Sequence, residues 1–110
     1  MTKRSFDRFK RQFTKWQKAF SLGEYSVGFK LKKFPDRFAE IDVDAEGCIA
    51  TVYVNETEKW TNETIDLVAK HEATHLLMAR FSEIARRRFL DEDELHNEEE
   101  RVVCILEKLL

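Results

Sequence analysis

Five aromatic side chains in the first twenty residues are spaced three and four positions apart, and this period constrains the fold more than any other feature of the sequence. They are Phe6, Phe9, Phe13, Trp16 and Phe20. Because a helix completes a turn every 3.6 residues, the five side chains share one face, while Lys and Arg occupy the other faces. The spacing predicts an amphipathic helix over Ser5–Phe20, capped by Ser5 and ended by Gly23, that packs its aromatic face into a core.

A period of two follows this helix. Residues 25–34 and then residues 38–43 alternate between apolar and polar side chains, and residues 48–54 are rich in β-branched residues. Two short turns, over residues 35–36 and 44–47, separate the three segments. Because short turns join neighbouring antiparallel strands, we expect a small three-stranded antiparallel sheet built as a meander.

Two further helices are expected to complete the chain. Residues 63–88 contain neither Pro nor Gly and follow a Thr-Asn pair that can cap a helix. Residues 98–110 carry an apolar stripe, and the acidic stretch 91–94 could begin this last helix, since anions favour a helix N-terminus. The sequence therefore predicts one α+β domain spanning residues 1–110.

One five-residue motif carries chemistry. His71-Glu72-Ala73-Thr74-His75 has the form His-Glu-x-x-His and lies within the second predicted helix. Residues four apart on a helix share a face, so His71 and His75 can present two imidazole nitrogens to one Zn²⁺ ion. Glu72 would stand beside the metal, where it can take a proton from a bound water and pass it to a leaving amine. The motif predicts a zinc-dependent peptidase with Glu72 as the general base.

An open catalytic zinc site needs a third protein ligand. No His-x-x-Gly-x-x-His continuation follows His75, so this ligand must come from elsewhere in the chain. Glu99 is the first candidate, because it falls on the predicted buried stripe of the last helix, where a metal would compensate an otherwise costly carboxylate. His96, Glu98 and Glu100 are the alternatives.

With these residues the chain resembles a compact zincin-type metallopeptidase of the gluzincin kind. It is similar in layout to the short phage-encoded, ImmA/IrrE-like and SprT-like zincin domains, although only residues 71–75 form a specific motif. The resemblance implies a zincin-like fold, bound zinc, a water nucleophile and hydrolysis of peptide bonds. A peptide or protein substrate would add its backbone to an edge strand, for which we expect residues 48–54.

Charge is divided unevenly along the chain. Residues 1–35 hold ten Lys and Arg against two acidic residues, a net charge of +8, whereas residues 36–110 hold nine against nineteen, a net charge of −10. The two parts could attract each other within the fold, or the basic part could bind a polyanion. The alternatives to a peptidase are therefore a non-catalytic, zinc-stabilised protein-interaction module and a nucleic-acid-associated module.

Other features of the sequence indicate the cellular compartment in which the protein is expected. No apolar run is long enough to span a membrane, and the first residues lead into a charged segment instead of a secretion signal. Cys48 and Cys104 are not spaced as a metal motif and are expected to be reduced thiols. The sequence predicts a cytoplasmic protein, with no membrane partner.

Overall fold

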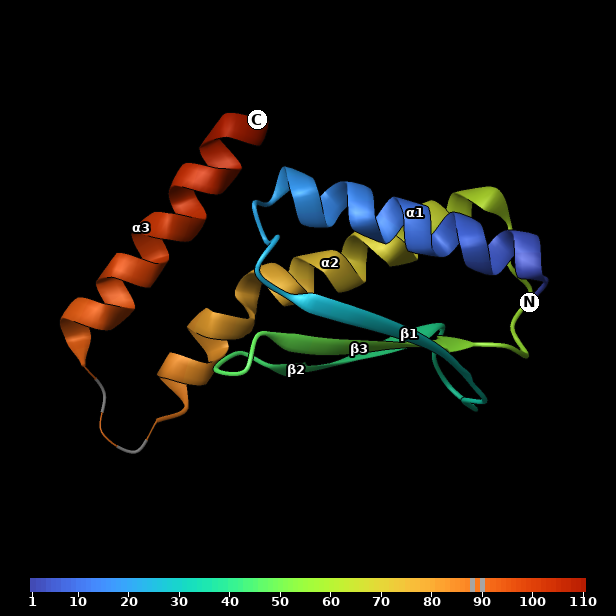
Figure 1. The fold of residues 1–110 in the computed structure, drawn as a ribbon, viewed down its shortest axis with the longest axis horizontal. Helices are drawn as coiled ribbons and strands as arrows, with labels where there is room; N and C mark the ends of the chain where they lie inside the picture. Colours follow the sequence, from blue (N-terminus) through green and yellow to red (C-terminus); the bar gives the residue numbers. More distant parts are fainter. Residues whose placement is uncertain (88, 90) are drawn as a thin grey trace.

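The computed structural model describes residues 1–87, 89 and 91–110, and this part of the chain forms three helices and three strands. They are α1 (Lys3–Ala19), β1 (Ser26–Lys32), β2 (Ala39–Asp44), β3 (Ile49–Asn55), α2 (Asn62–Ala85) and α3 (Glu92–Leu109). In Figure 1, α1 and α2 lie side by side over one face of the sheet, and α3 extends beyond them. The α+β class and the order of the elements confirm the prediction from the sequence.

Helix α1 begins and ends differently from the prediction. Its N-cap is Thr2, whose hydroxyl oxygen accepts a hydrogen bond from the backbone N–H of Ser5 at 3.1 Å, so Ser5 lies inside the first turn. The helix ends with Phe20 as C-cap, and Ser21 takes the left-handed conformation with a φ of 58°. Gly23 has no positive φ and is not the stop signal. A non-glycine residue thus takes the conformation usually left to Gly after a helix.

The sheet is mixed, which corrects the predicted antiparallel meander. Its order is β1-β3-β2, with β1 parallel to β3 and β2 antiparallel to β3. Strand β3 buries Ala50, Val52 and Val54, whereas β1 and β2 carry Lys and Asp side chains at alternate positions. The most apolar strand therefore takes the centre, and the charged strands form the edges, where charges protect against unwanted pairing.

This order also corrects the predicted edge strand. Residues 48–54 largely coincide with β3, which is paired on both sides and cannot accept another strand. The edge that lies against α2 is β2.

Aromatic contacts join α1 to the sheet and to the start of α2. Phe9 and Phe13 are fully buried and meet Phe29 of β1 edge to face, with ring centroids 6.4 and 5.3 Å apart. Phe9 also meets Trp60 at 6.0 Å, and the indole N–H of Trp60 donates to the backbone carbonyl of Asn55 at 2.7 Å. This packing confirms that the aromatic stripe belongs to the core, and it fixes the segment that enters α2.

The two later helices differ slightly from their predicted bounds. Helix α2 ends at Ala85 with Arg86 as C-cap, and the predicted end at Arg88 falls outside the described residues. Helix α3 begins after Asp91, whose side chain accepts from two backbone N–H groups, so the acidic stretch does start this helix. Among the helices of the described ranges, none is long and apolar enough to cross a membrane.

Candidate functional site

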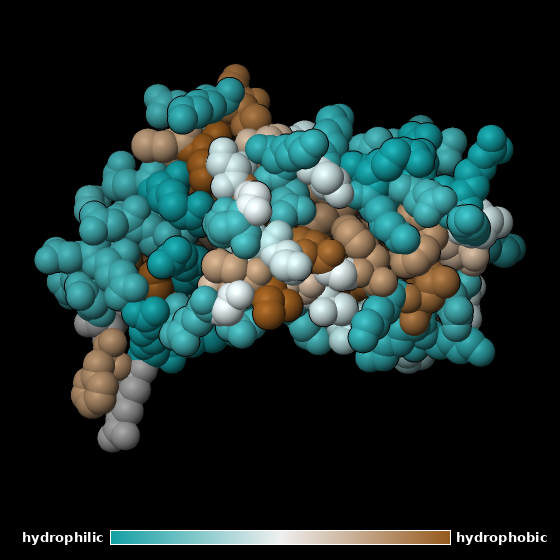
Figure 2. Space-filling view, viewed as in Figure 1, coloured by the Kyte–Doolittle hydropathy of each residue, from teal (hydrophilic) through white to brown (hydrophobic). Residues whose placement is uncertain are grey.

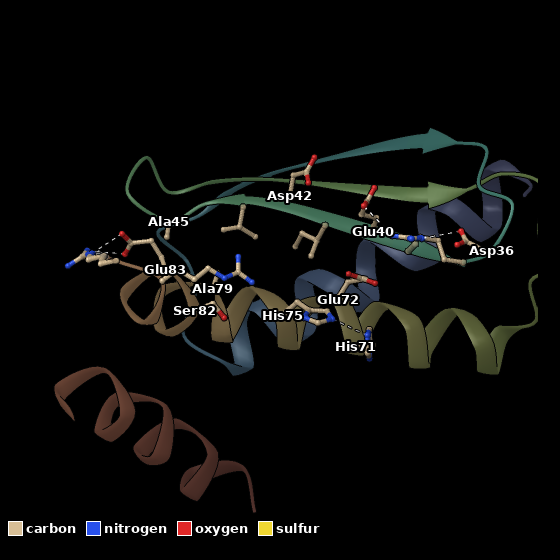
Figure 3. Close-up of a pocket in the computed structure, with 16 residues that line it drawn as sticks. Asp36, Glu40, Asp42, Ala45, His71, Glu72, His75, Ala79, Ser82 and Glu83 are labelled. Carbon is tan, nitrogen blue, oxygen red and sulfur yellow. Dashed lines mark hydrogen bonds and ion pairs between the residues drawn. The ribbon is translucent and has the colours of Figure 1, made fainter. Parts of the chain in front are cut away.

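The motif lies in the middle of α2, on the side of the helix that faces β2. Thr61 caps the helix by accepting a hydrogen bond from the backbone N–H of Thr64 at 3.1 Å. The core side of α2 is apolar and includes Ile65, Ala69, Ala73, Leu76 and Leu77. Figure 3 shows His71, Glu72 and His75 on the adjacent side, below β2. The helix therefore presents the motif toward an edge of the sheet.

The two histidines lie next to each other. Their Nε2 atoms are 3.1 Å apart, and the ring planes are inclined by 83°. Two nitrogens that bind one zinc ion at about 2.0–2.1 Å each must lie within about 4 Å of each other, and this pair meets that condition. Both imidazoles are exposed, so an ion can reach them from solvent. The 3.1 Å separation is a hydrogen-bond distance between the two rings and is also compatible with two nitrogens on one zinc ion, as the i, i+4 pattern predicts.

Glu72 is buried beside this exposed pair, with 5% of its surface accessible. Burial raises the pKa of the Glu72 carboxyl above its ordinary value. Of the nearby groups, His71 lowers this pKa, Glu40 raises it and Arg37 lowers it, and burial is the largest cause. A carboxyl group in such surroundings holds a proton more readily than one in water, which suits a group that accepts and returns protons.

An open cleft of about 990 Å³ separates this side of α2 from β2. Ala39, Ile41 and Val43 of β2 line it opposite His71 and His75. The backbone N–H of Asn55 donates to the carbonyl of Phe38 at 2.8 Å, which sets the alternation of the β2–β3 ladder. By that alternation the backbone groups of Ala39, Ile41 and Val43 point away from β3. The cleft is therefore bordered by a strand edge that can pair with an extended chain.

Acidic side chains of β2 and its preceding turn also line the cleft. Asp36, Glu40 and Asp42 stand above α2 in Figure 3, and Arg37 makes ion pairs of 3.3 Å with both Asp36 and Glu40. None of these three residues is predicted to belong to the site from the sequence. Glu40 and Asp42 alternate with apolar residues along residues 38–43, a pattern that predicts a strand but not a site, and Asp36 lies in the turn before it.

Helix α3 buries a different face from the one that the sequence predicts. Glu98 is buried at 6% exposure together with Val102, whereas Glu99 and Val103 are exposed. The Arg101 guanidinium donates to the Glu98 carboxylate with bonds of 2.6 to 3.0 Å, which compensates the buried charge. The prediction that Glu99 lies on the buried stripe is therefore wrong.

The structure brings together two of the predicted zinc ligands but not a third. His96 and Glu100 are exposed on α3, as is Glu99. Among the residues that the structure describes, no three His, Cys, Asp or Glu side chains form a group that could hold a metal ion. The site consists of the histidine pair, Glu72 and the cleft below β2.

No protein-family model matches this chain, and neither the curated proteins nor the solved structures include a significant match. The geometry of this site is therefore the basis for inferring a function.

Proposed function

We propose that the protein is a zinc-dependent metallopeptidase with a zincin-like site, in which His71 and His75 hold the metal and Glu72 is the general base. The observation that carries the proposal is the pair of Nε2 atoms 3.1 Å apart beside a buried carboxyl group, at a cleft bordered by a strand edge. A pair of surface histidines without a function would not require a buried carboxyl group or a cleft beside it.

Each part has one task in the reaction. Bound zinc would supply a Lewis acid that polarises the scissile carbonyl and lowers the pKa of a water molecule. Glu72 takes the proton from that water and delivers it to the nitrogen of the leaving amine. Its burial keeps bulk water away from the carboxyl group that carries the proton.

The substrate would lie along β2. An extended peptide that pairs with the outward backbone groups of Ala39, Ile41 and Val43 passes over His71 and His75 on the opposite wall of the cleft. This placement replaces β3 by β2 as the docking strand and keeps the predicted mode of binding.

We propose a carboxylate as the third ligand. Glu99 is the first candidate from the sequence but is exposed on α3, while Glu40 lines the cleft together with the histidine pair. Zinc content per chain, measured by elemental analysis on Glu99→Ala and Glu40→Ala, separates the two. The variant that loses the metal names the ligand, and His96→Ala, Glu98→Ala and Glu100→Ala complete the series.

The decisive experiment compares zinc content and peptide hydrolysis in four proteins. Wild type is expected to hold about one zinc per chain and to cleave a library of fluorogenic peptides, and His71→Ala is expected to lose both properties. Glu72→Gln should keep the zinc and lose hydrolysis by about 10²-fold or more, since a general base contributes on that order. Glu63→Gln, an exposed position in the first turn of the same helix, is the matched control and should resemble wild type.

Three results would contradict the proposal. If wild type holds no zinc after supplementation, the proposed metal site is excluded. If hydrolysis is undiminished in Glu72→Gln, Glu72 is excluded as the general base. Zinc that is closed by four protein ligands, with no hydrolysis, would support the zinc-stabilised interaction module instead.

A further inference from the structure

The basic part of the chain makes few direct ion pairs with the acidic part in the described residues. Between residues 1–35 and residues 36–110, the structure as described forms a single side-chain ion pair, which joins Arg8 to Asp66 at 2.8 Å. Lys10 approaches Asp7 of its own helix at 3.9 Å, and the other side-chain ion pairs of the described residues lie within residues 36–110. Direct ion pairs with the acidic part therefore leave most of these cationic side chains available to another partner.

The basic residues of α1 gather on its outer side. Exposed cationic side chains along this helix are Lys3, Arg4, Arg11, Lys15 and Lys18. A shallow hollow runs over the same side, lined by Lys10, Arg11, Thr14, Lys15 and Lys18. Lys70 of α2 extends this surface, because its ammonium lies 4.8 Å from the ring centre of Trp16, which Lys15 also approaches at 5.3 Å. In Figure 2 hydrophilic side chains lie along the upper part of the region of α1, and apolar side chains lie below them.

We propose that this surface, the outer side of α1 together with Lys70, binds the phosphate backbone of double-stranded nucleic acid. From Lys3 to Lys18 the helix rises about 22 Å at 1.5 Å per residue. Phosphates of one strand are spaced about 3.4 Å apart along the duplex axis, so the basic side of α1 matches several successive phosphates. Contacts of this kind do not depend on base sequence.

The positions of the aromatic residues of α1 favour a duplex over the other polyanions that this surface could bind. A helix that lies in a membrane surface inserts its apolar face, but Phe9 and Phe13 are fully buried in the core. Single strands bind by stacking bases on exposed rings, yet lysines lie over Phe6 and Trp16. An acidic protein partner would bring apolar contacts, for which this side of α1 offers no apolar side chain.

The outer side of α1 and the cleft lie at opposite edges of the sheet, while Lys70 of the proposed surface directly precedes His71 in α2. Helix α1 packs on β1 through Phe29, whereas the cleft lies at β2, and β3 separates the two strands. A duplex that binds along α1 is therefore expected to leave the β2 side of the cleft accessible. The inference does not depend on the proposed peptidase activity, and Glu72→Gln is expected to bind duplex as wild type does.

Fluorescence anisotropy with a labelled 20-base-pair DNA of mixed sequence tests the proposal across a salt series. Wild type is expected to bind at low salt and to weaken steeply as salt rises, because phosphate contacts release counterions. The variant Arg11→Gln/Lys15→Gln/Lys18→Gln removes three contacts and should reduce the slope of log K against log salt by about 2.7, at about 0.9 per contact. Its affinity at low salt should fall at least tenfold.

The matched control is Lys30→Gln/Lys32→Gln/Lys33→Gln, which removes the same charge from β1 and the turn after it. Circular dichroism verifies that both variants are folded. The control should retain the affinity and the slope of wild type. The proposal is overturned if wild type does not bind at low salt, or if the control loses as much affinity as the α1 variant. Tighter binding to single strands or to phosphatidylserine vesicles than to the duplex overturns it as well.

Discussion

The first and last helices of the chain are both amphipathic, but the fold uses them differently. In α1 the aromatic stripe is the centre of the core, with Phe9 and Phe13 at 0% exposure. In α3 Val102 is buried, while its neighbour Val103 and Leu106 remain 48% and 38% exposed. A helical period alone therefore shows that a helix has an apolar side, not how completely that side is covered.

The comparison predicts the largest effect at Phe13. Replacing it by Ala leaves a cavity against Phe29 and removes an edge-to-face contact at 5.3 Å, so the free energy of unfolding should fall by about 3–5 kcal/mol. That loss is a large share of the stability of a small domain. Urea unfolding followed by circular dichroism measures it, and a loss below about 1 kcal/mol would contradict the central place of α1.

The contrast between α1 and α3 also explains which parts of the fold could be predicted from the sequence. Five aromatic residues at one helical phase allow a single inward face, so the burial of α1 could be read from the sequence. In α3, Val102, Val103, Ile105 and Leu106 cover more than one side, and the spacing does not decide which side packs. That ambiguity led to the wrong assignment of Glu99 to the buried stripe.

The candidate site likewise has one part that the sequence predicts and one part that it does not. The adjacency of His71 and His75 follows from one turn of helix and was predictable. The cleft depends on which strand is an edge, and this is a property of the whole sheet. Short turns favour a meander locally, but the burial of β3 places it between β1 and β2. Long-range packing therefore determines which strand forms the free edge beside α2, and no local pattern reveals it.

The second prediction concerns how α3 is held. Arg101→Ala leaves the Glu98 carboxylate buried without its partner, which costs about 1–3 kcal/mol unless α3 moves away from α2. Amide hydrogen exchange should therefore accelerate about tenfold or more in α3 and remain unchanged in α1. The double variant Glu98→Met/Arg101→Met removes both charges and should restore protection. Equal acceleration in α1 would show that the two helices open together.

The third prediction concerns the ion pair that joins α1 to α2. Hydrogen bonds from Arg8 lower the pKa of the Asp66 carboxyl below its ordinary value. The ionised form is thus favoured in the folded protein, and its contribution is present above the ordinary pKa and lost as pH falls through the folded pKa. Asp66→Asn should cause a small loss of stability at pH 7, because both side chains are about one-third exposed. In urea unfolding at several pH values, the difference from wild type should shrink in acid, and a constant difference would exclude the ion pair as its cause.

The smallest effect is predicted at Val103, the exposed neighbour of the buried Val102 on α3. Val103→Ser changes a side chain that is 48% exposed and should alter the free energy of unfolding by no more than about 0.5 kcal/mol. The adjacent Val102→Ser buries a hydroxyl at a 6% exposed position and should cost about 1–3 kcal/mol. Urea unfolding of the two variants thus reports which face of α3 packs inward. If the order were reversed, the inward face would be the one that Val103 shares with Glu99, and Glu99 would return as a buried carboxylate in need of a partner.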